Sequence, residues 1–457
     1  MIDGVCFYFF FPRVGNFTET QIQRSTERKS LGFLTVVSLV ISSQVGSGIF
    51  IFPADLAPFG TLGLLGWPIA VAGAIALALV FSELSSKIVK NGGPHVYIRE
   101  AFGEKAGFFC AWIYWIISWA SNSILLVTMT NYLSTMVGDL GPCPTVLIQT
   151  AVLFIIASIN LMGVRTSGAI EICLTFLKVT PLFVLPLLFF TAFNPENFKI
   201  SATTSLSTAN TINIMTQAAL LIFWGFIGIE CATTPAGRIK NAQKTLPKAI
   251  IVGTSCVALI YIFNVISVFG VVGFDALIHS KAPYALAIGK IAPGFAVGDR
   301  LISLLAIIVC IGTLNAWTLS AGQIAQGASE DRLFPLILGK TNGRDAPVVA
   351  IFTDTLGIIP FLIAAQVFGN EGLDRLITFM ASVFLIIYFS CAIAYVRMIK
   401  AWKNKTFDRI KAYVLALFAA AFCIFIIAQN LRNSFITLAV FILTGIPVYY
   451  WRNVRSL

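Results

Sequence analysis

The chain has 457 residues, of which 58% are hydrophobic and only 11% are charged. This composition is too apolar for a single soluble core. A formal net charge of +11 would suit nucleic acid, but the basic residues are spread over alternate loops instead of gathering on one face. No nucleic-acid partner is therefore expected, and the partner we do expect is the lipid bilayer.

Apolar stretches long enough to cross a bilayer, about 20 residues each, recur from one end of the chain to the other. They predict an all-α integral membrane protein with about twelve transmembrane helices. A tail, residues 1–30, precedes them and is expected to be cytoplasmic. The expected spans are 33–54, 64–81, 106–133, 146–162, 169–190, 212–236, 249–272, 301–325, 348–367, 377–396, 412–428 and 435–451.

The first and the sixth of these stretches are interrupted by glycines. The interruptions are Gln-Val-Gly-Ser-Gly at 44–48 and Trp-Gly-Phe-Ile-Gly-Ile-Glu at 224–230. Glycine lets a spanning helix unwind, and the freed N–H and C=O groups then need partners that lipid does not supply. Because a polar substrate can be that partner, paired breaks indicate the substrate site of a secondary transporter.

The positions of the breaks also predict how the chain is organised. An odd number of spans per repeat places two repeats in opposite orientations, so the two breaks would face each other near the bilayer midplane. We predict a first inverted repeat at 31–193, a second at 211–396 and a terminal helix pair at 397–457. The halves share no visible sequence repetition, so this prediction depends on hydropathy and on the breaks.

The distribution of basic residues predicts the topology. Lysine and arginine concentrate in alternate connections, most densely at 397–411, and such connections face the cytoplasm. An even number of spans then places both termini there. We expect a multi-pass protein of the cell membrane, which in a Gram-negative organism is the inner membrane.

Other functional classes find little support in the sequence. The nine cysteines form no C-x-x-C pair and the only histidines are His95 and His279, so neither a metal nor another cofactor is expected. An integral-membrane enzyme would need a catalytic pattern such as H-E-x-x-H or G-x-S-x-G, and neither occurs. A channel or a sensor would fit the spans but leaves the paired breaks unexplained.

Five short segments stand out: Gly-Ser-Gly-Ile-Phe at 46–50, Gly-Gly-Pro-His-Val-Tyr at 92–97, the second break at 224–230, Trp-Thr-Leu-Ser-Ala-Gly-Gln at 317–323 and Leu-Phe-Pro at 333–335. By these segments the chain, from Ser30 onward, resembles the amino acid-polyamine-organocation transporters. Within that superfamily it is most similar to the basic amino acid/polyamine antiporters, above all those that exchange arginine for agmatine. The resemblance implies a leucine-transporter-type fold, alternating access, exchange of a basic amino acid for its amine or another cationic amino acid, and a possible homodimer through the last two spans.

The two breaks suggest how a small zwitterion would be held. N–H groups of the segment Val45, Gly46, Ser47 and Gly48 would begin the second half-helix, where the helix dipole is positive, and suit a carboxylate. Carbonyls freed in 224–227, from Trp224 to Ile227, would suit an α-ammonium group. The alternative is that these glycines only permit close helix packing.

The resemblance assigns further site residues. Trp317 matches the tryptophan on which a guanidinium stacks through a cation–π contact, and Trp224 matches an aromatic gate over the substrate. Asn122 matches a polar residue at the far end of the substrate, and Ser118 of the same segment is included in this site. Packing at the core or at the membrane boundary is the alternative for the tryptophans.

Two charged residues inside the spans are further candidates, since their burial in a membrane is costly. Glu230 resembles a gating or pH-sensing glutamate, with a purely structural acid as the alternative. Lys178 departs from the arginine/agmatine exchangers, which have a small apolar residue there, and resembles superfamily members in which a lysine stands in for a sodium ion. It could load and release a proton, which makes proton-coupled symport the alternative function, while snorkelling to the membrane surface is the structural alternative.

Three more polar residues lie inside or near predicted spans. Glu171, Asn264 and Asp354 are expected to be interhelical hydrogen-bond partners, which is the usual use of polar groups between membrane helices.

Overall fold

The computed structural model describes residues 31–198, 208–278, 280, 282–293, 297–428 and 431–454. The predicted N-terminal tail at 1–30 and His279 lie outside these residues. Within them the chain is helical, without a β-strand, as predicted. The helices are α2 (Phe33–Gln44), α3 (Gly48–Leu56), η1 (Ala57–Phe59), α4 (Gly60–Leu64), α5 (Gly66–Lys87), α6 (Pro94–Phe102), α7 (Glu104–Val137), α8 (Pro142–Leu161), α9 (Val164–Phe190), η2 (Pro195–Phe198), α10 (Thr208–Trp224), η3 (Cys231–Thr233), η4 (Ala236–Arg238), α11 (Ala242–Val272), α12 (Phe274–Ile278), α13 (Pro283–Ile291), α14 (Gly298–Glu330), η5 (Leu336–Gly339), α15 (Val348–Trp402), α16 (Thr406–Ala428) and α17 (Leu431–Val454).

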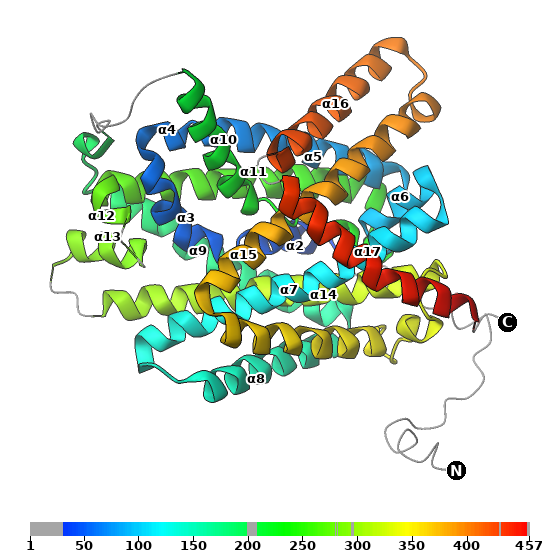
Figure 1. Cartoon of the computed structure of the whole chain (residues 1–457), viewed down its shortest axis with the longest axis horizontal. Coiled ribbons are helices and arrows are strands. Elements are labelled where there is room, and N and C mark those ends of the chain that lie inside the picture. Colours follow the sequence, from blue (N-terminus) through cyan, green and yellow to red (C-terminus); the bar gives the residue numbers. More distant parts are fainter. Residues whose placement is uncertain are drawn as a thin grey trace.

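The membrane-spanning character of the chain is confirmed. Among the described residues, nine helical segments are long and apolar enough to cross a bilayer, and a tenth span is the pair Phe33–Gln44 and Gly48–Leu64, bent by 41°. Two shorter apolar helical segments, Thr211–Trp224 and Leu438–Tyr450, complete the twelve predicted stretches. The predicted ninth and tenth spans belong to one continuous helix, α15, which Figure 1 shows turning back on itself.

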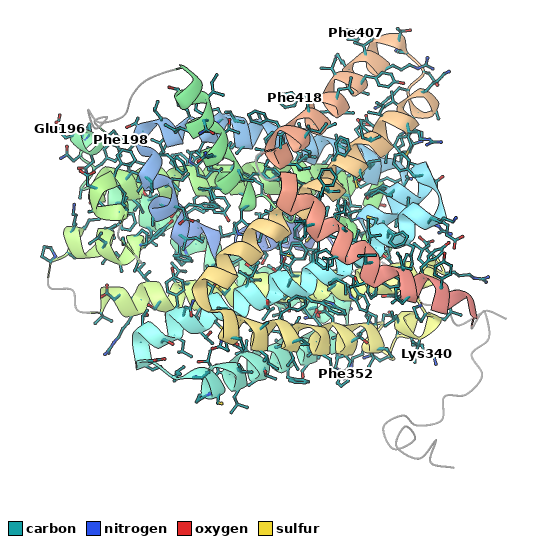
Figure 2. The ribbon with its side chains drawn as sticks, viewed as in Figure 1. Glu196, Phe198, Lys340, Phe352, Phe407 and Phe418 are labelled. Carbon is teal, nitrogen blue, oxygen red and sulfur yellow. The ribbon has the colours of Figure 1, made fainter. Side chains whose placement is uncertain are left out.

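The outer surface of the bundle is apolar along the length of the helices. Phe352 of α15 and Phe418 of α16 are 52% and 50% exposed, and both lie on the outside of the bundle in Figure 2. The charged residues Glu196 and Lys340 lie at opposite ends of it. This arrangement is that of a bundle with its sides in lipid and its ends in water.

The centre of the bundle holds the elements that build the site. α7 is the most buried of the spans, and it runs beside α14 (Figure 1). On the other side α2 packs against both α9 and α11. The broken first span therefore lies in the middle of the bundle, surrounded by helices that supply side chains to its exposed backbone groups.

Candidate functional site

The first span is broken at the predicted position. α2 ends at Gln44 and α3 begins at Gly48. A helix end leaves its last carbonyls without partners, and here four consecutive carbonyls, those of residues 42–45, receive side-chain donors from three other helices. The bonds run from Lys178 Nζ to Ser42 O (2.8 Å), from Trp317 Nε1 to Ser43 O (3.1 Å), from Tyr261 Oη to Gln44 O (2.9 Å) and from Thr313 Oγ1 to Val45 O (2.7 Å).

The opposite side of the break presents N–H groups. The N–H of Gly46 lies beside the Tyr261 hydroxyl. Those of Ser47 and Gly48 donate to no main-chain or side-chain acceptor among the described residues. Because they begin α3, they stand at the positive end of its dipole and can receive an anion.

The sixth span is also broken, but not as predicted. We expected the interrupted helix to continue to residue 236, whereas α10 ends at Trp224 and the chain continues in tight turns through η3 and η4. Gly228 adopts φ +110°, and a side chain there would bring a Cβ to 2.9 Å from the Ser43 carbonyl. This backbone conformation and the close approach both require glycine and prevent a regular helix.

The carbonyls of the second break are only partly free. Trp224 O accepts from Ile227 N at 3.3 Å, so this carbonyl, which was expected to face a substrate, is used within the turn. The carbonyls of Gly225, Phe226 and Ile227 accept no hydrogen bond from the described residues. They are the acceptors that this break can offer to a cation.

A cavity of about 50 Å³ lies between the two breaks. This volume holds a few water molecules and is smaller than an amino acid. The walls must therefore separate before a substrate of that size can enter. The lining residues are Ser43, Gln44, Gly46, Ser47, Gly48, Ser121, Ile124, Leu125, Trp224, Gly225, Ile227, Tyr261, Thr313 and Trp317.

The structure brings together most of the predicted substrate-binding residues. Gly46, Ser47, Gly48, Trp224, Ile227 and Trp317 line the cavity. Val45 does not line it, and its carbonyl is held by Thr313 and Lys178. Ser118 and Asn122 lie outside the lining as well. The Ser118 hydroxyl donates to the carbonyl of Trp115 at 2.6 Å, and the fully buried Asn122 amide has no hydrogen-bond partner among the residues that the structure describes.

Five polar lining residues were not among the predicted substrate-binding residues: Ser43, Gln44, Ser121, Tyr261 and Thr313. Thr313 precedes Trp317 by four residues and so shares its face of α14, which is a signal that could have revealed it. Ser121 is one of several polar residues at 118–123, and Tyr261 lies in an apolar stretch of α11. Nothing in their sequence neighbourhood indicates that they face the cavity.

Glu230 is fully buried directly after the second break. Its carboxylate accepts hydrogen bonds from Tyr114 Oη at 2.8 Å and from the Tyr388 hydroxyl. Tyr388 in turn accepts a bond from the N–H of Gly228 at 3.0 Å. The acid is thus tied to the second break and to α7 and α15.

Lys178 is fully buried, which removes the snorkelling alternative. Its ammonium group donates to the carbonyls of Ser42 and Val45 and to Thr313 Oγ1, at 2.8–3.1 Å. A cation at this place complements the negative C-terminal end of α2. Lys178 therefore has a structural role at the first break, independent of any role in proton coupling.

Two of the three other polar candidates make the expected interhelical bonds. Glu171 of α9 accepts a 2.6 Å bond from Asn315 of α14, and Asn264 of α11 donates a 2.7 Å bond to the carbonyl of Leu182 in α9. The expectation is wrong for Asp354, because neither of its carboxylate oxygens has a hydrogen-bond partner in the part of the chain that the structure describes.

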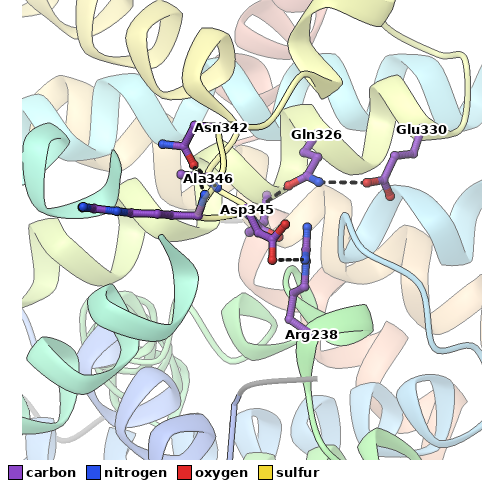
Figure 3. Close-up of polar contacts among 8 residues, drawn as sticks. Arg238, Gln326, Glu330, Asn342, Asp345 and Ala346 are labelled. Carbon is purple, nitrogen blue, oxygen red and sulfur yellow. Dashed lines mark hydrogen bonds and ion pairs between the residues drawn. The ribbon is translucent and has the colours of Figure 1, made fainter. Parts of the chain in front are cut away.

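A polar layer joins the segments at the Lys340 end of the bundle (Figure 3). Arg238 of η4 approaches Asp345 at 3.6 Å, and Gln326 donates a 2.9 Å bond to Glu330. Beside this layer, Arg99 of α6 forms an ion pair with Asp331 at 2.5 Å. These contacts tie η4 to the loop before α15, and α6 to the end of α14.

His95 of α6 is buried next to that ion pair. Its Nδ1 lies 3.0 Å from the Gly92 carbonyl and so carries the proton, while Nε2 is 3.8 Å from Asp331. Burial lowers the pKa of His95 from 6.5 to about 4, although the Asp331 charge opposes this shift. The imidazole is therefore neutral at physiological pH.

Spans that break in the middle of the bundle, with a small cavity between the breaks, define a multi-span membrane protein of the secondary-transporter type. The chain belongs to the amino acid permease family, whose sequence profile matches residues 31–451. The resemblance to the amino acid-polyamine-organocation superfamily is thereby confirmed.

Curated relatives cover most of the chain at moderate identity. The chain is 29% identical to a putative arginine/ornithine antiporter of Bacillus subtilis, over 93% of this chain and 96% of the relative. It is 28% identical to an arginine/ornithine antiporter of Pseudomonas aeruginosa, over 89% and 86%. It is 26% identical to a cadaverine/lysine antiporter of Escherichia coli, over 75% and 77%.

Proposed function

We propose that the protein exchanges a basic amino acid, such as arginine, for its decarboxylated amine or for another cationic amino acid by alternating access. The observation that carries this proposal is the cavity between the breaks, where the N–H groups of Ser47 and Gly48 and the carbonyls of Gly225 and Ile227 are available. These groups suit the carboxylate and the α-ammonium of one amino acid. The relatives support the cationic class, since they are antiporters of arginine, ornithine, lysine and cadaverine.

The aromatic residues of the cavity fit a cationic side chain. Trp317 offers a ring face for cation–π attraction, and its indole N–H is already fixed by the Ser43 carbonyl. Trp224 ends α10 at the cavity and serves as a gate over the substrate. Asn122 and Ser118 are assigned to the far end of the substrate, and Glu230 acts as a gating acid behind the second break. No catalytic step is assigned to any of them.

The transport cycle requires the two proposed repeats to move against each other. Residues 31–193 and 211–396 each contribute one break, and the terminal pair at 397–457 lies after them in the chain. The cavity is smaller than the proposed substrate, which supports a cycle that passes through a closed state.

The membrane placement is part of the same proposal. Arg238, Asp345 and the other charged residues of the polar layer lie at the Lys340 end, which we assign to the cytoplasm together with both termini. The proposed location is the cell membrane, or the inner membrane of a Gram-negative cell. A homodimer through α16 and α17 would cover apolar side chains such as Phe418.

The test is exchange in proteoliposomes. Vesicles loaded with arginine, ornithine, lysine, agmatine or cadaverine, and empty vesicles as the control, receive labelled arginine outside. We expect rapid uptake only into loaded vesicles, with basic amino acids and amines as the effective internal substrates. Equal uptake into empty vesicles, without an imposed ion gradient, would contradict exchange.

Proton-coupled symport is the second candidate, and the position of Lys178 favours it. The ammonium group binds two carbonyls of the first break, so loss of its proton would release groups next to the cavity. In this case a pH gradient drives uptake into empty vesicles. Full gradient-driven uptake by a Lys178→Ala variant would remove the basis of this candidate.

A further inference from the structure

A second cavity, of about 330 Å³, lies between α6, α7, α15 and α17. It shares no lining residue with the cavity between the two breaks. Its described lining is apolar except for Ser390, whose hydroxyl donates to the carbonyl of Ile386 at 2.8 Å and so is already used. Apolar cavities in proteins stay dry and take up apolar molecules instead of water. The natural occupant of this cavity is therefore an apolar group.

The cavity reaches the lipid-facing surface of the bundle. Phe102, at one end of the lining, is 40% exposed, and Ile386, Ile393 and Leu438 are half-buried. In a membrane the molecules around this surface are phospholipids. An acyl chain is thus the apolar group that can enter the cavity without crossing water.

The dimensions of the cavity fit a chain of one leaflet. The lining extends along α7 from Ala106 to Ile113 and along α15 from Val383 to Ile393. With a rise of about 1.5 Å per residue, these segments are roughly 10 and 15 Å long. The hydrocarbon core of a bilayer is about 30 Å thick. The cavity therefore spans no more than about half of it, which is the depth of one leaflet.

A cation lies at the mouth of the cavity, which we define as its Phe102 end. The guanidinium of Arg397 is 5.5 Å from the centroid of the Phe102 ring, and Arg397 follows Ile393 by one turn of α15. Arg397 is exposed, and no carboxylate among the described residues forms an ion pair with it. Its charge is therefore available to a phosphate group outside the cavity.

The other exposed charges near the mouth leave it basic. Lys105 and Lys400 are exposed within three residues of Phe102 and Arg397. The exposed acids over the same distance are Glu100 and Glu104, so three cations stand against two carboxylates. The mouth is at the end of the bundle that we assign to the cytoplasm. Basic pockets between spans on that side suit anionic lipid headgroups.

We propose that this cavity binds one acyl chain of a membrane phospholipid and that Arg397 holds the anionic headgroup of that lipid, such as phosphatidylglycerol. The inference goes beyond the proposed transport function and does not depend on the substrate. A zwitterionic phospholipid with the same chains fills the cavity equally well, but the positive group of its headgroup offsets the attraction of its phosphate to Arg397. The cavity supplies affinity for the chain, whereas Arg397 supplies the preference for an anionic headgroup.

The test measures lipid binding to purified, delipidated protein. Phosphatidylglycerol and phosphatidylcholine with identical chains are titrated separately, and native mass spectrometry and the melting temperature report binding. We expect one retained phosphatidylglycerol, tighter binding than of phosphatidylcholine, and a higher melting temperature, because a ligand of the folded state stabilises it. Arg397→Gln should weaken phosphatidylglycerol binding by about 5-fold and leave phosphatidylcholine binding unchanged.

Lys411→Gln is the matched control. Lys411 is also exposed, and its ammonium group lies 4.2 Å from the ring centroid of Phe407, but neither residue lines this cavity. The change should alter the binding of neither lipid. Equal binding of the two lipids by the wild type, or equal losses in Arg397→Gln and Lys411→Gln, overturns the role of Arg397.

Ser390→Phe tests the cavity itself by filling it. We expect weaker binding of both lipids, with a melting temperature in lipid-free detergent close to that of the wild type, which shows that the variant folds. Unchanged binding of both lipids overturns the proposed chain site. If Ser390→Phe instead converts a dimer to a monomer in light scattering while lipid binding persists, a second copy of the chain occupies the cavity and the inference is wrong.

Discussion

The hydroxyl of Ser43 donates a 2.9 Å hydrogen bond to the carbonyl of Gly228, and this bond joins the two helix breaks directly. The carbonyl of Ser43 accepts the indole N–H of Trp317, and the N–H of Gly228 binds Tyr388, which donates to Glu230. One chain of hydrogen bonds therefore links both breaks to Trp317, to Tyr388 and to the buried acid Glu230. A movement of either break must alter the bonds of the other.

Replacing Ser43 with alanine tests this connection. The change removes one of two donors to the buried Gly228 carbonyl, which keeps the N–H of Cys231 at 3.1 Å, so we expect the free energy of unfolding to fall by about 0.5–1.5 kcal/mol. Ser123→Ala is the matched control, since the Ser123 hydroxyl bonds only to Ala120 O within its own helix. Thermal unfolding of the two purified variants measures the difference, and an equal loss in both would show that the connection between the breaks carries no special stability.

Lys178→Met removes the cation that binds the carbonyls of Ser42 and Val45. Hydrogen bonds from charged donors contribute about 1.5–3 kcal/mol each, and the cation also complements the α2 dipole, so we expect clear destabilisation. Lys290→Met is the control, because Lys290 donates to Val272 O at a partly exposed position. A smaller effect at position 178 than at 290, in chemical unfolding, would contradict the structural role of Lys178.

Trp317 is expected to contribute to substrate affinity through its ring. Trp317→Leu should weaken arginine binding by about 2- to 30-fold, the range of a cation–π contact. Trp317→Phe should lose less, because it keeps an aromatic ring although it gives up the bond to Ser43 O. Calorimetric titration with arginine gives both values, with Trp402→Phe, at the end of α15, as the control. Equal losses for Leu and Phe would exclude a cation–π role.

His95 should make stability depend on pH. Its pKa is about 4 in the folded protein and 6.5 when unfolded, so between these values the unfolded state binds more protons. Stability is then fully present above about pH 6.5 and falls as the pH drops towards 4, by at most about 3 kcal/mol. His95→Gln should remove this contribution. Melting temperatures of both proteins across this range provide the comparison, and parallel curves would refute it.

The sequence predicted the site best where the structure depends on local backbone conformation. Glycines at 46 and 48 and at 225 and 228 were enough to locate both breaks, because no other residue permits such backbone freedom at low cost. The course of the chain after Trp224 was not predictable in the same way. Its turns depend on the contact between Gly228 and Ser43, which are far apart in sequence.

Side chains of the site were harder to predict, because their direction depends on how distant helices pack. Ser118 and Ser121 look alike in sequence, yet one hydroxyl is bonded to its own helix and the other lines the cavity. Tyr261 binds the carbonyl of Gln44 only because α11 packs on α2.

The most direct test of the central claim, that a substrate is held by main-chain groups at the two breaks, is an experimental structure with arginine bound. We expect the arginine carboxylate at hydrogen-bond distance, about 3 Å, from the N–H groups of Ser47 and Gly48, and its α-ammonium beside the carbonyls of Gly225 and Ile227. Arginine bound elsewhere, with the α2–α3 break contacting only protein, would contradict the account.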